Sequence, residues 1–79
     1  MSKNLIGQRI RIARAMMNPP ICQADLLARL QLNGMQISQA TLSKIETGAR
    51  AVSDMELVEI AKALKVDILW LLGETEKKI

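Results

Sequence analysis

Apolar positions recur along the chain with the three-to-four-residue spacing of an amphipathic helix. In the segment from about residue 4 to residue 17 they fall at Ile6, Ile10, Ala13 and Met17, which share one face of a helix. Asn18-Pro19-Pro20 follows, and proline ends a helix because it has no N–H to donate and restricts the residue before it. The pattern therefore predicts a first helix over about 4–17.

Two further segments show the same spacing and clear end signals. A second helix is predicted over about 23–32 and offers the core Leu26, Leu27 and Leu30. Asn33-Gly34 ends it, because glycine adopts the left-handed conformation that closes many helices. Ser38 can cap a third helix, which we expect to end at Thr47-Gly48.

The last two predicted helices also begin at capping residues. Ser53-Asp54-Met55-Glu56 has the form of a capping box, and the helix after it presents an inner face of Leu57, Ile60, Ala61 and Leu64. Asp67 can cap a fifth helix that ends at Gly73. β-Branched residues are sparse, so no strand pattern competes. The sequence predicts an all-α, compact five-helix domain over residues 1–73 and a polar tail over 74–79.

Composition narrows the class of protein. Apolar residues make up 49% of the 79 residues, enough for the core of one domain. With one cysteine, Cys22, and no histidine, an intrachain disulfide and a zinc site of the Cys/His kind are excluded. The longest apolar run covers residues 68–72, and the first residues lack the apolar stretch of a signal peptide. We expect a soluble, cytoplasmic protein with no metal, cofactor or membrane contact.

Charge is distributed unevenly along the chain. Residues 1–50 carry a net charge of +5 and residues 51–79 a net charge of −2. The basic residues of the first part are Lys3, Arg9, Arg11, Arg14, Arg29, Lys44 and Arg50. This asymmetry suits contact between the first part and a polyanion such as nucleic acid. The alternative is charge that serves solubility alone.

The predicted helix over about 39–47 has one apolar and one polar face. At 100° per residue, Leu42 and Ile45 fall together, and the opposite face carries Gln39, Ala40, Ser43, Lys44 and Thr47. That outward face holds no acid. Small side chains with hydrogen-bonding groups suit a helix that enters the major groove of DNA, where Gln pairs with adenine and Lys reaches guanine or phosphate. An ordinary solvated face remains the alternative reading.

The order of these segments resembles the phage-repressor-like helix-turn-helix family of the Cro/CI type. The resemblance covers about residues 5–73 and rests on four stretches and a closing Trp70-Leu71-Leu72-Gly73. The stretches are Ile6-Gly7-Gln8-Arg9-Ile10-Arg11, Gln23-Ala24-Asp25-Leu26, Thr41-Leu42-Ser43-Lys44-Ile45-Glu46-Thr47-Gly48 and Ile60-Ala61-Lys62-Ala63-Leu64-Lys65-Val66. It implies a lambda-repressor-like domain, with the second and third helices forming the helix-turn-helix, and a sequence-specific transcription regulator, a repressor, that binds double-stranded DNA.

The resemblance also implies roles for individual residues. Base contacts would come from Gln39, Ala40, Ser43 and Lys44, and phosphate contacts from Gln23, Thr47 and Arg50. Arg14 and Glu46 would form a structural ion pair, so we expect Arg14 not to touch DNA.

Two features depart from the family pattern: the turn before the third helix, taken together with Leu27, and the residue at position 22. The turn of residues 33–37 is at least five residues long, whereas such turns usually have three or four, and Leu27 stands where the family commonly has alanine. Cys22 stands where a Ser or Thr cap is expected. We interpret it as a small, half-buried side chain rather than a redox switch.

Family members bind DNA as homodimers, and the fifth helix is the predicted contact. Ile68 and Leu71 fit an inward stripe, so Leu69 and Trp70 would project outward as an apolar pair. The alternative is that Trp70 packs back over the first or fourth helix. Met16, Met17 and Met35 could serve either an interface or the core.

Two other function classes compete with a DNA-binding regulator. A helix-turn-helix fold can serve as a protein-interaction module, in an adaptor or antitoxin-like role, without specific DNA binding. An enzyme is not expected, because the sequence offers no histidine, no glycine-rich phosphate loop, no paired carboxylates and no activated nucleophile. We also expect no second domain that binds a small-molecule effector. We expect a bacterial or phage-encoded regulator.

Overall fold

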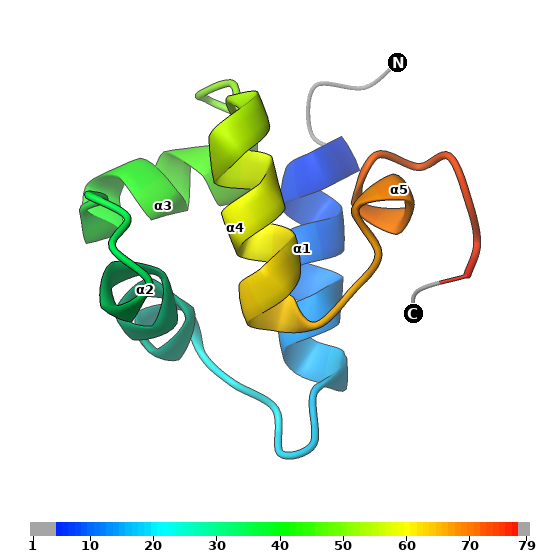
Figure 1. Ribbon diagram of the computed structural model, residues 1–79, viewed down its shortest axis with the longest axis horizontal. Helices are drawn as coiled ribbons and strands as arrows, with labels where there is room; N and C mark the ends of the chain where they lie inside the picture. The colour runs from blue at the N-terminus through cyan, green and yellow to red at the C-terminus, as the bar shows by residue number, and fades with distance from the viewer. Residues whose placement is uncertain (1–4, 78–79) are drawn as a thin grey trace.

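Five helices make up most of residues 5–77, the part of the chain that the computed structural model describes (Figure 1). They are α1 (Leu5–Met16), α2 (Gln23–Leu32), α3 (Gln39–Thr47), α4 (Asp54–Leu64) and α5 (Ile68–Leu71). No strand occurs among these residues, so the predicted all-α, five-helix domain is confirmed. Asn4 and the last two residues of the predicted tail lie outside the described residues. None of the described helices is long and apolar enough to cross a membrane.

The predicted caps hold three helix starts in place. The Ser38 hydroxyl oxygen accepts the N–H of Thr41 at 3.1 Å. Ser53 and Glu56 form the reciprocal capping box, with distances of 3.2 and 2.9 Å, and an Asp67 carboxylate oxygen accepts the N–H of Leu69 at 2.8 Å. Because these bonds satisfy N–H groups that a helix leaves unpaired, local sequence fixes where the helices begin.

The start of α2 is capped in a different way. Asp25 accepts both the backbone N–H of Cys22, at 3.2 Å, and its thiol, at 3.3 Å, and these bonds lower the pKa of the Asp25 carboxyl group. Cys22 is exposed, so the half-buried side chain predicted there is wrong. The acid in the first turn compensates for the weak capping ability of a thiol.

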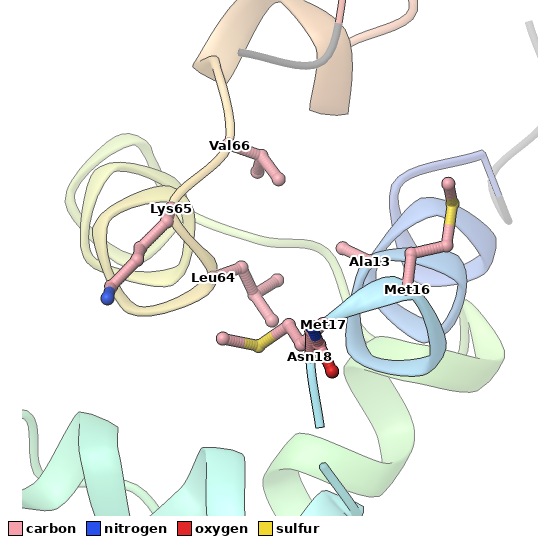
Figure 2. A pocket seen from close by; sticks show the side chains of 7 residues that line it. All are labelled: Ala13, Met16, Met17, Asn18, Leu64, Lys65 and Val66. Carbon is pink, nitrogen blue, oxygen red and sulfur yellow. The ribbon is translucent and has the colours of Figure 1, made fainter. Parts of the chain in front are cut away.

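The core lies where α1 and α4 run between the α2–α3 pair and α5 (Figure 1). Its most deeply buried apolar side chains come from all five helices: Ile10, Leu26, Leu30, Leu42, Ile45, Ile60 and Leu71. Leu27, Met17 and Met35 are half-buried against this core. Met16 is exposed and lines a groove of about 230 Å³ between the C-terminal ends of α1 and α4 (Figure 2). Met17 and Met35 therefore pack against the core, and Met17 lines this groove together with Met16.

The connection between α2 and α3 is as long as the sequence suggested. It takes in residues 33–38, with Gly34 at a φ of +90°. Ile37 is buried, and its carbonyl accepts a hydrogen bond from the Gln31 side chain at 3.0 Å. The buried Ile37 side chain and this hydrogen bond hold the long connection against the rest of the domain.

Trp70 does not project from the surface as predicted. Its side chain is only 7% exposed, and the Arg9 guanidinium lies 4.8 Å from the ring centroid. Because α5 is a single turn, it has no extended stripe. Leu71 is buried and Ile68 is half-buried against the core, as predicted, but Trp70 is buried as well. The alternative of Trp70 packed towards the first helix is the correct one. Leu69 remains exposed, at 48%.

Candidate nucleic-acid interface

The C-terminal half of α3 lies against the N-terminal half of α1. At Gly7, a Cβ atom would come within 2.7 Å of the Ile45 carbonyl oxygen and of the Glu46 carbonyl carbon. Real Cβ atoms do not approach backbone that closely. The absent side chain at Gly7 therefore allows α1 and α3 to touch, and this contact sets the position of α3 on the domain.

Glu46 fixes the same junction through its carboxylate. Arg14 donates to both carboxylate oxygens, from Nε at 3.0 Å and from Nη2 at 2.7 Å. Gln23 adds a hydrogen bond from Nε2 at 3.3 Å. The structure thus contains the ion pair that the resemblance implies, and it ties α1, α2 and α3 together at one point.

The opposite face of α3 is open to solvent. Gln39, Ala40, Lys44 and Thr47 are exposed and Ser43 is half-buried, whereas Leu42, Ile45 and Glu46 are buried. The one acid of this helix is therefore turned inward, and the outward face carries no negative side chain. All four residues predicted to contact bases lie on this face.

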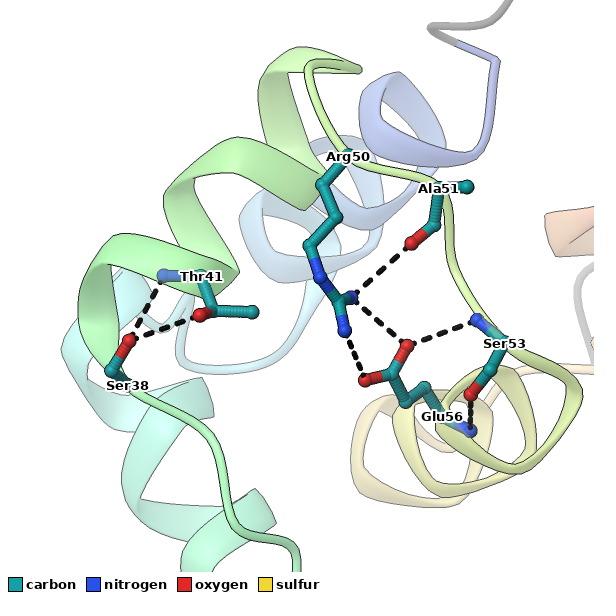
Figure 3. Close-up of polar contacts among 6 residues, drawn as sticks. All are labelled: Ser38, Thr41, Arg50, Ala51, Ser53 and Glu56. Atoms are coloured by element: carbon teal, nitrogen blue, oxygen red, sulfur yellow. Dashed lines mark hydrogen bonds and ion pairs between the residues drawn. The ribbon is translucent and has the colours of Figure 1, made fainter.

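The three predicted phosphate contacts are less freely available. Gln23 is half-buried and directs its amide nitrogen to Glu46, which leaves it one N–H to donate. The Thr47 hydroxyl donates to the Lys44 carbonyl at 3.2 Å. Arg50 donates to both carboxylate oxygens of Glu56 at 3.0 Å (Figure 3). Thr47 and Arg50 stay exposed near the end of α3, and Gln23 lies at the start of α2.

Comparison with known proteins places this arrangement in a family. A family model described as helix-turn-helix matches residues 28–71, which is more than half of the chain and includes all of α3 and α4. The chain belongs to the helix-turn-helix family. Neither a curated protein nor a solved structure matches it. The match leaves out α1 and the start of α2, which carry Arg14 and Gln23.

Helix-turn-helix domains of this family bind DNA. The basic residues of the chain can therefore be divided into those that bond within the domain and those that are free to contact a duplex. Several of them are used inside the domain. Arg9 donates to the Trp70 carbonyl at 2.9 Å, Arg29 to the Ala63 carbonyl at 3.4 Å, and Arg11 to the Glu46 carbonyl. Each of these carbonyls lies in the last turn of a helix. Lys3 lies outside the described residues. These hydrogen bonds orient three of the guanidinium groups on the domain without removing their charge, and Arg11 stays exposed.

Two residues near this helix-turn-helix surface were missed by sequence reasoning. Arg11 was noted only among the basic residues and in a matching stretch, and Glu56 only as a member of a capping box. Nothing in the sequence pairs Glu56 with Arg50, because the path of the loop between α3 and α4 decides that contact. Arg50, together with an N–H of Ser53, lowers the pKa of the Glu56 carboxyl group, and Glu56 raises the pKa of Arg50.

Proposed function

We propose that the protein is a sequence-specific transcription regulator, a repressor, that reads the major groove of DNA with the exposed face of α3. The observation that carries this proposal is the open, acid-free face formed by Gln39, Ala40, Ser43 and Lys44. Because Glu46 is buried in its pair with Arg14, no carboxylate on α3 faces an approaching phosphate backbone. The proposal includes no catalytic activity.

The order of side chains on this face suits the groove. The small side chain of Ala40 at the start of α3 lets the helix approach base edges in a groove ~12 Å wide. Gln39 can pair through its amide with N6 and N7 of adenine, and Lys44 can donate to guanine or to phosphate. Within residues 5–77 no ion pair involves Lys44, so its ammonium group is available.

The test is selection of bound sequences from random duplex DNA, followed by affinity measurements on the selected site at several salt concentrations. Replacing Lys44 with alanine should weaken binding and lower the salt slope by about 0.9 if the contact is to phosphate. Gln39→Ala should cost about 1–3 kcal/mol at a single base pair and relax the preference there. Lys62→Ala is the matched control, because Lys62 is exposed in the last turn of α4.

Two outcomes would count against this function. If the unmodified protein selects no sequence and shows no salt-dependent affinity for duplex DNA, DNA recognition is wrong, and the fold serves protein interaction instead. If Lys44→Ala and Lys62→Ala have equal effects, the exposed face of α3 is not the DNA-binding surface.

We further propose that the protein binds DNA as a homodimer, with Leu69 in the contact. Two α3 helices then read half-sites ~34 Å apart on one side of the duplex. Leu69→Ser should raise the dimer Kd at least about tenfold, because burying a leucine side chain contributes about 1.5–3 kcal/mol. Sedimentation measures this, with Leu32→Ser on α2 as the exposed-leucine control. Equal dimer Kd values for the two variants would show that Leu69 is not in the contact.

A further inference from the structure

Arg50 is held at one end of its guanidinium group. Nη1 donates to Glu56 Oε1 at 3.0 Å and to the Ala51 carbonyl at 3.2 Å, and Nη2 donates to Glu56 Oε2 at 3.0 Å. Figure 3 shows the side chain reaching from the segment after α3 to the first turn of α4. These three hydrogen bonds fix the direction of the guanidinium plane.

The other edge of the same group is open. A guanidinium has five N–H groups, and the two not used by Glu56 and Ala51 belong to Nε and Nη2, which point along one edge. Within residues 5–77 no acceptor takes them. Arg14 uses this same edge to bind both carboxylate oxygens of Glu46, at 3.0 and 2.7 Å. The open edge of Arg50 therefore fits two oxygens of one anionic group.

Arg50 lies beside the proposed DNA-binding face. Its backbone N–H donates to the Lys44 carbonyl at 3.3 Å, so its main chain adjoins the end of α3. Its side chain is 41% exposed, and Lys44 and Thr47 are exposed on the last turns of α3. An anion bound by Arg50 would lie next to the helix that reads the bases.

Glu56 is itself held rigidly. One carboxylate oxygen accepts the Ser53 N–H at 2.9 Å, and the Glu56 N–H donates to the Ser53 hydroxyl oxygen at 3.2 Å. Its side chain is 21% exposed. Arg50 is consequently anchored to the start of α4, and its rotamer is selected before any ligand arrives. Such preorganisation reduces the entropy lost when a long side chain binds.

We propose that Glu56 is a positioning residue for DNA-backbone binding, which orients Arg50 so that its Nε/Nη2 edge receives a phosphate group. The inference rests on the proposed function. The guanidinium lies between two anions, with the carboxylate at its Nη end and the phosphate on its open edge. Glu56 does not touch DNA in this arrangement and acts through Arg50.

The experiment is a double-mutant cycle on duplex DNA that carries the selected site. Wild type, Glu56→Gln, Arg50→Ala and the double variant are compared over a range of salt concentrations. Glutamine keeps the capping-box role at this position but removes the negative charge that binds Arg50. We expect E56Q to weaken binding by about 3- to 10-fold, as is typical of residues in one network. R50A should also lower the salt slope by about 0.9, and E56Q should have no weakening effect in the R50A background.

The sign of the effect separates positioning from simple electrostatics. Glu59→Gln is the control, because Glu59 is on the next turn of α4 and pairs with Lys62 at 3.7 Å. Removing a carboxylate near DNA generally strengthens binding, so E59Q should leave affinity unchanged or slightly higher, whereas E56Q should lower it. Tighter binding by E56Q would show that Glu56 competes with phosphate for Arg50 and would overturn the proposal. Equal weakening in both Arg50 backgrounds would overturn it as well.

Folding and the underlying function are checked in the same series. Circular dichroism should give the same helix content for all variants. If E56Q is unfolded at the assay temperature, Arg50→Lys replaces it. Lysine keeps the charge but has no second edge, so affinity should fall with little change in salt slope, and wild-type affinity in that variant would overturn the proposal. Failure of the wild type to bind any duplex would instead reject the proposed function itself.

Discussion

The Arg14–Glu46 pair should respond unequally to loss of its two members. The Glu46 side chain is 3% exposed and that of Arg14 is 17% exposed. With Arg14→Met, a buried carboxylate keeps one side-chain donor, Gln23 Nε2 at 3.3 Å. With Glu46→Leu, the guanidinium keeps the Ile21 carbonyl at 3.3 Å and can turn towards solvent. We therefore expect the Arg14 variant to be the less stable one.

The expected losses are large for a domain of this size. Removing one partner of a buried ion pair costs about 3–5 kcal/mol, and we place Arg14→Met near the upper value and Glu46→Leu near the lower. A domain of 79 residues has a total free energy of unfolding of about 4–12 kcal/mol. With a urea m-value of about 1 kcal/mol per M, the urea midpoint should fall by about 5 M for Arg14→Met and by about 3 M for Glu46→Leu.

The double variant decides whether the pair or its uncompensated charge controls stability. Replacing both members with apolar side chains of similar volume is often nearly neutral, so the combined variant should unfold within about 1 kcal/mol of the wild type. Urea unfolding followed by circular dichroism measures all four proteins. A double variant as unstable as the sum of the single changes, or a Glu46 variant less stable than the Arg14 variant, would refute this reasoning.

Two further predictions concern the junction of α1 with α3 and the start of α4. Gly7→Ala should destabilise the domain by about 1–3 kcal/mol despite the better helix propensity of alanine, because its methyl group would meet the α3 backbone. Gln8→Ala, at an exposed neighbour, is the control, and equal unfolding midpoints would contradict the close contact. Arg50 lowers the pKa of Glu56 below its usual value of 4.5, so Glu56 stabilises the fold above that pH. This contribution is lost as the pH falls through the lowered pKa. Urea midpoints between pH 7 and pH 3 should therefore drop less for Glu56→Gln than for wild type, and identical drops would exclude this linkage.

The helices were predictable because their signals are local. The periodic apolar positions and the caps at Ser38, Ser53 and Asp67 lie within one or two turns of the boundaries they set. Predicted and observed bounds of the second and third helices coincide. The outward face of α3 was predictable for the same reason, since its periodicity separates Leu42 and Ile45 from the polar positions.

Features that depend on packing between distant segments were not predictable. Helical periodicity could not orient Trp70, because α5 has four residues and its side chains are placed by contacts with α1. For the same reason, the sequence could not show whether the side chains predicted to contact phosphate are free to do so. Whether Gln23 and Arg50 face solvent or a carboxylate depends on Glu46 and Glu56, which approach them only in the folded chain.

The basic first half of the chain has a cause apart from DNA. Arg11, Arg29 and Arg9 donate to carbonyls in the last turns of α3, α4 and α5 respectively, where helices leave acceptors unpaired and carry partial negative charge. Arginine suits this role because it donates several hydrogen bonds and stays charged. Part of the charge asymmetry therefore builds the domain. Lys44 and the open edge of Arg50 lie at the exposed face of α3, where each phosphate contact should add about 0.9 to the salt slope of DNA affinity.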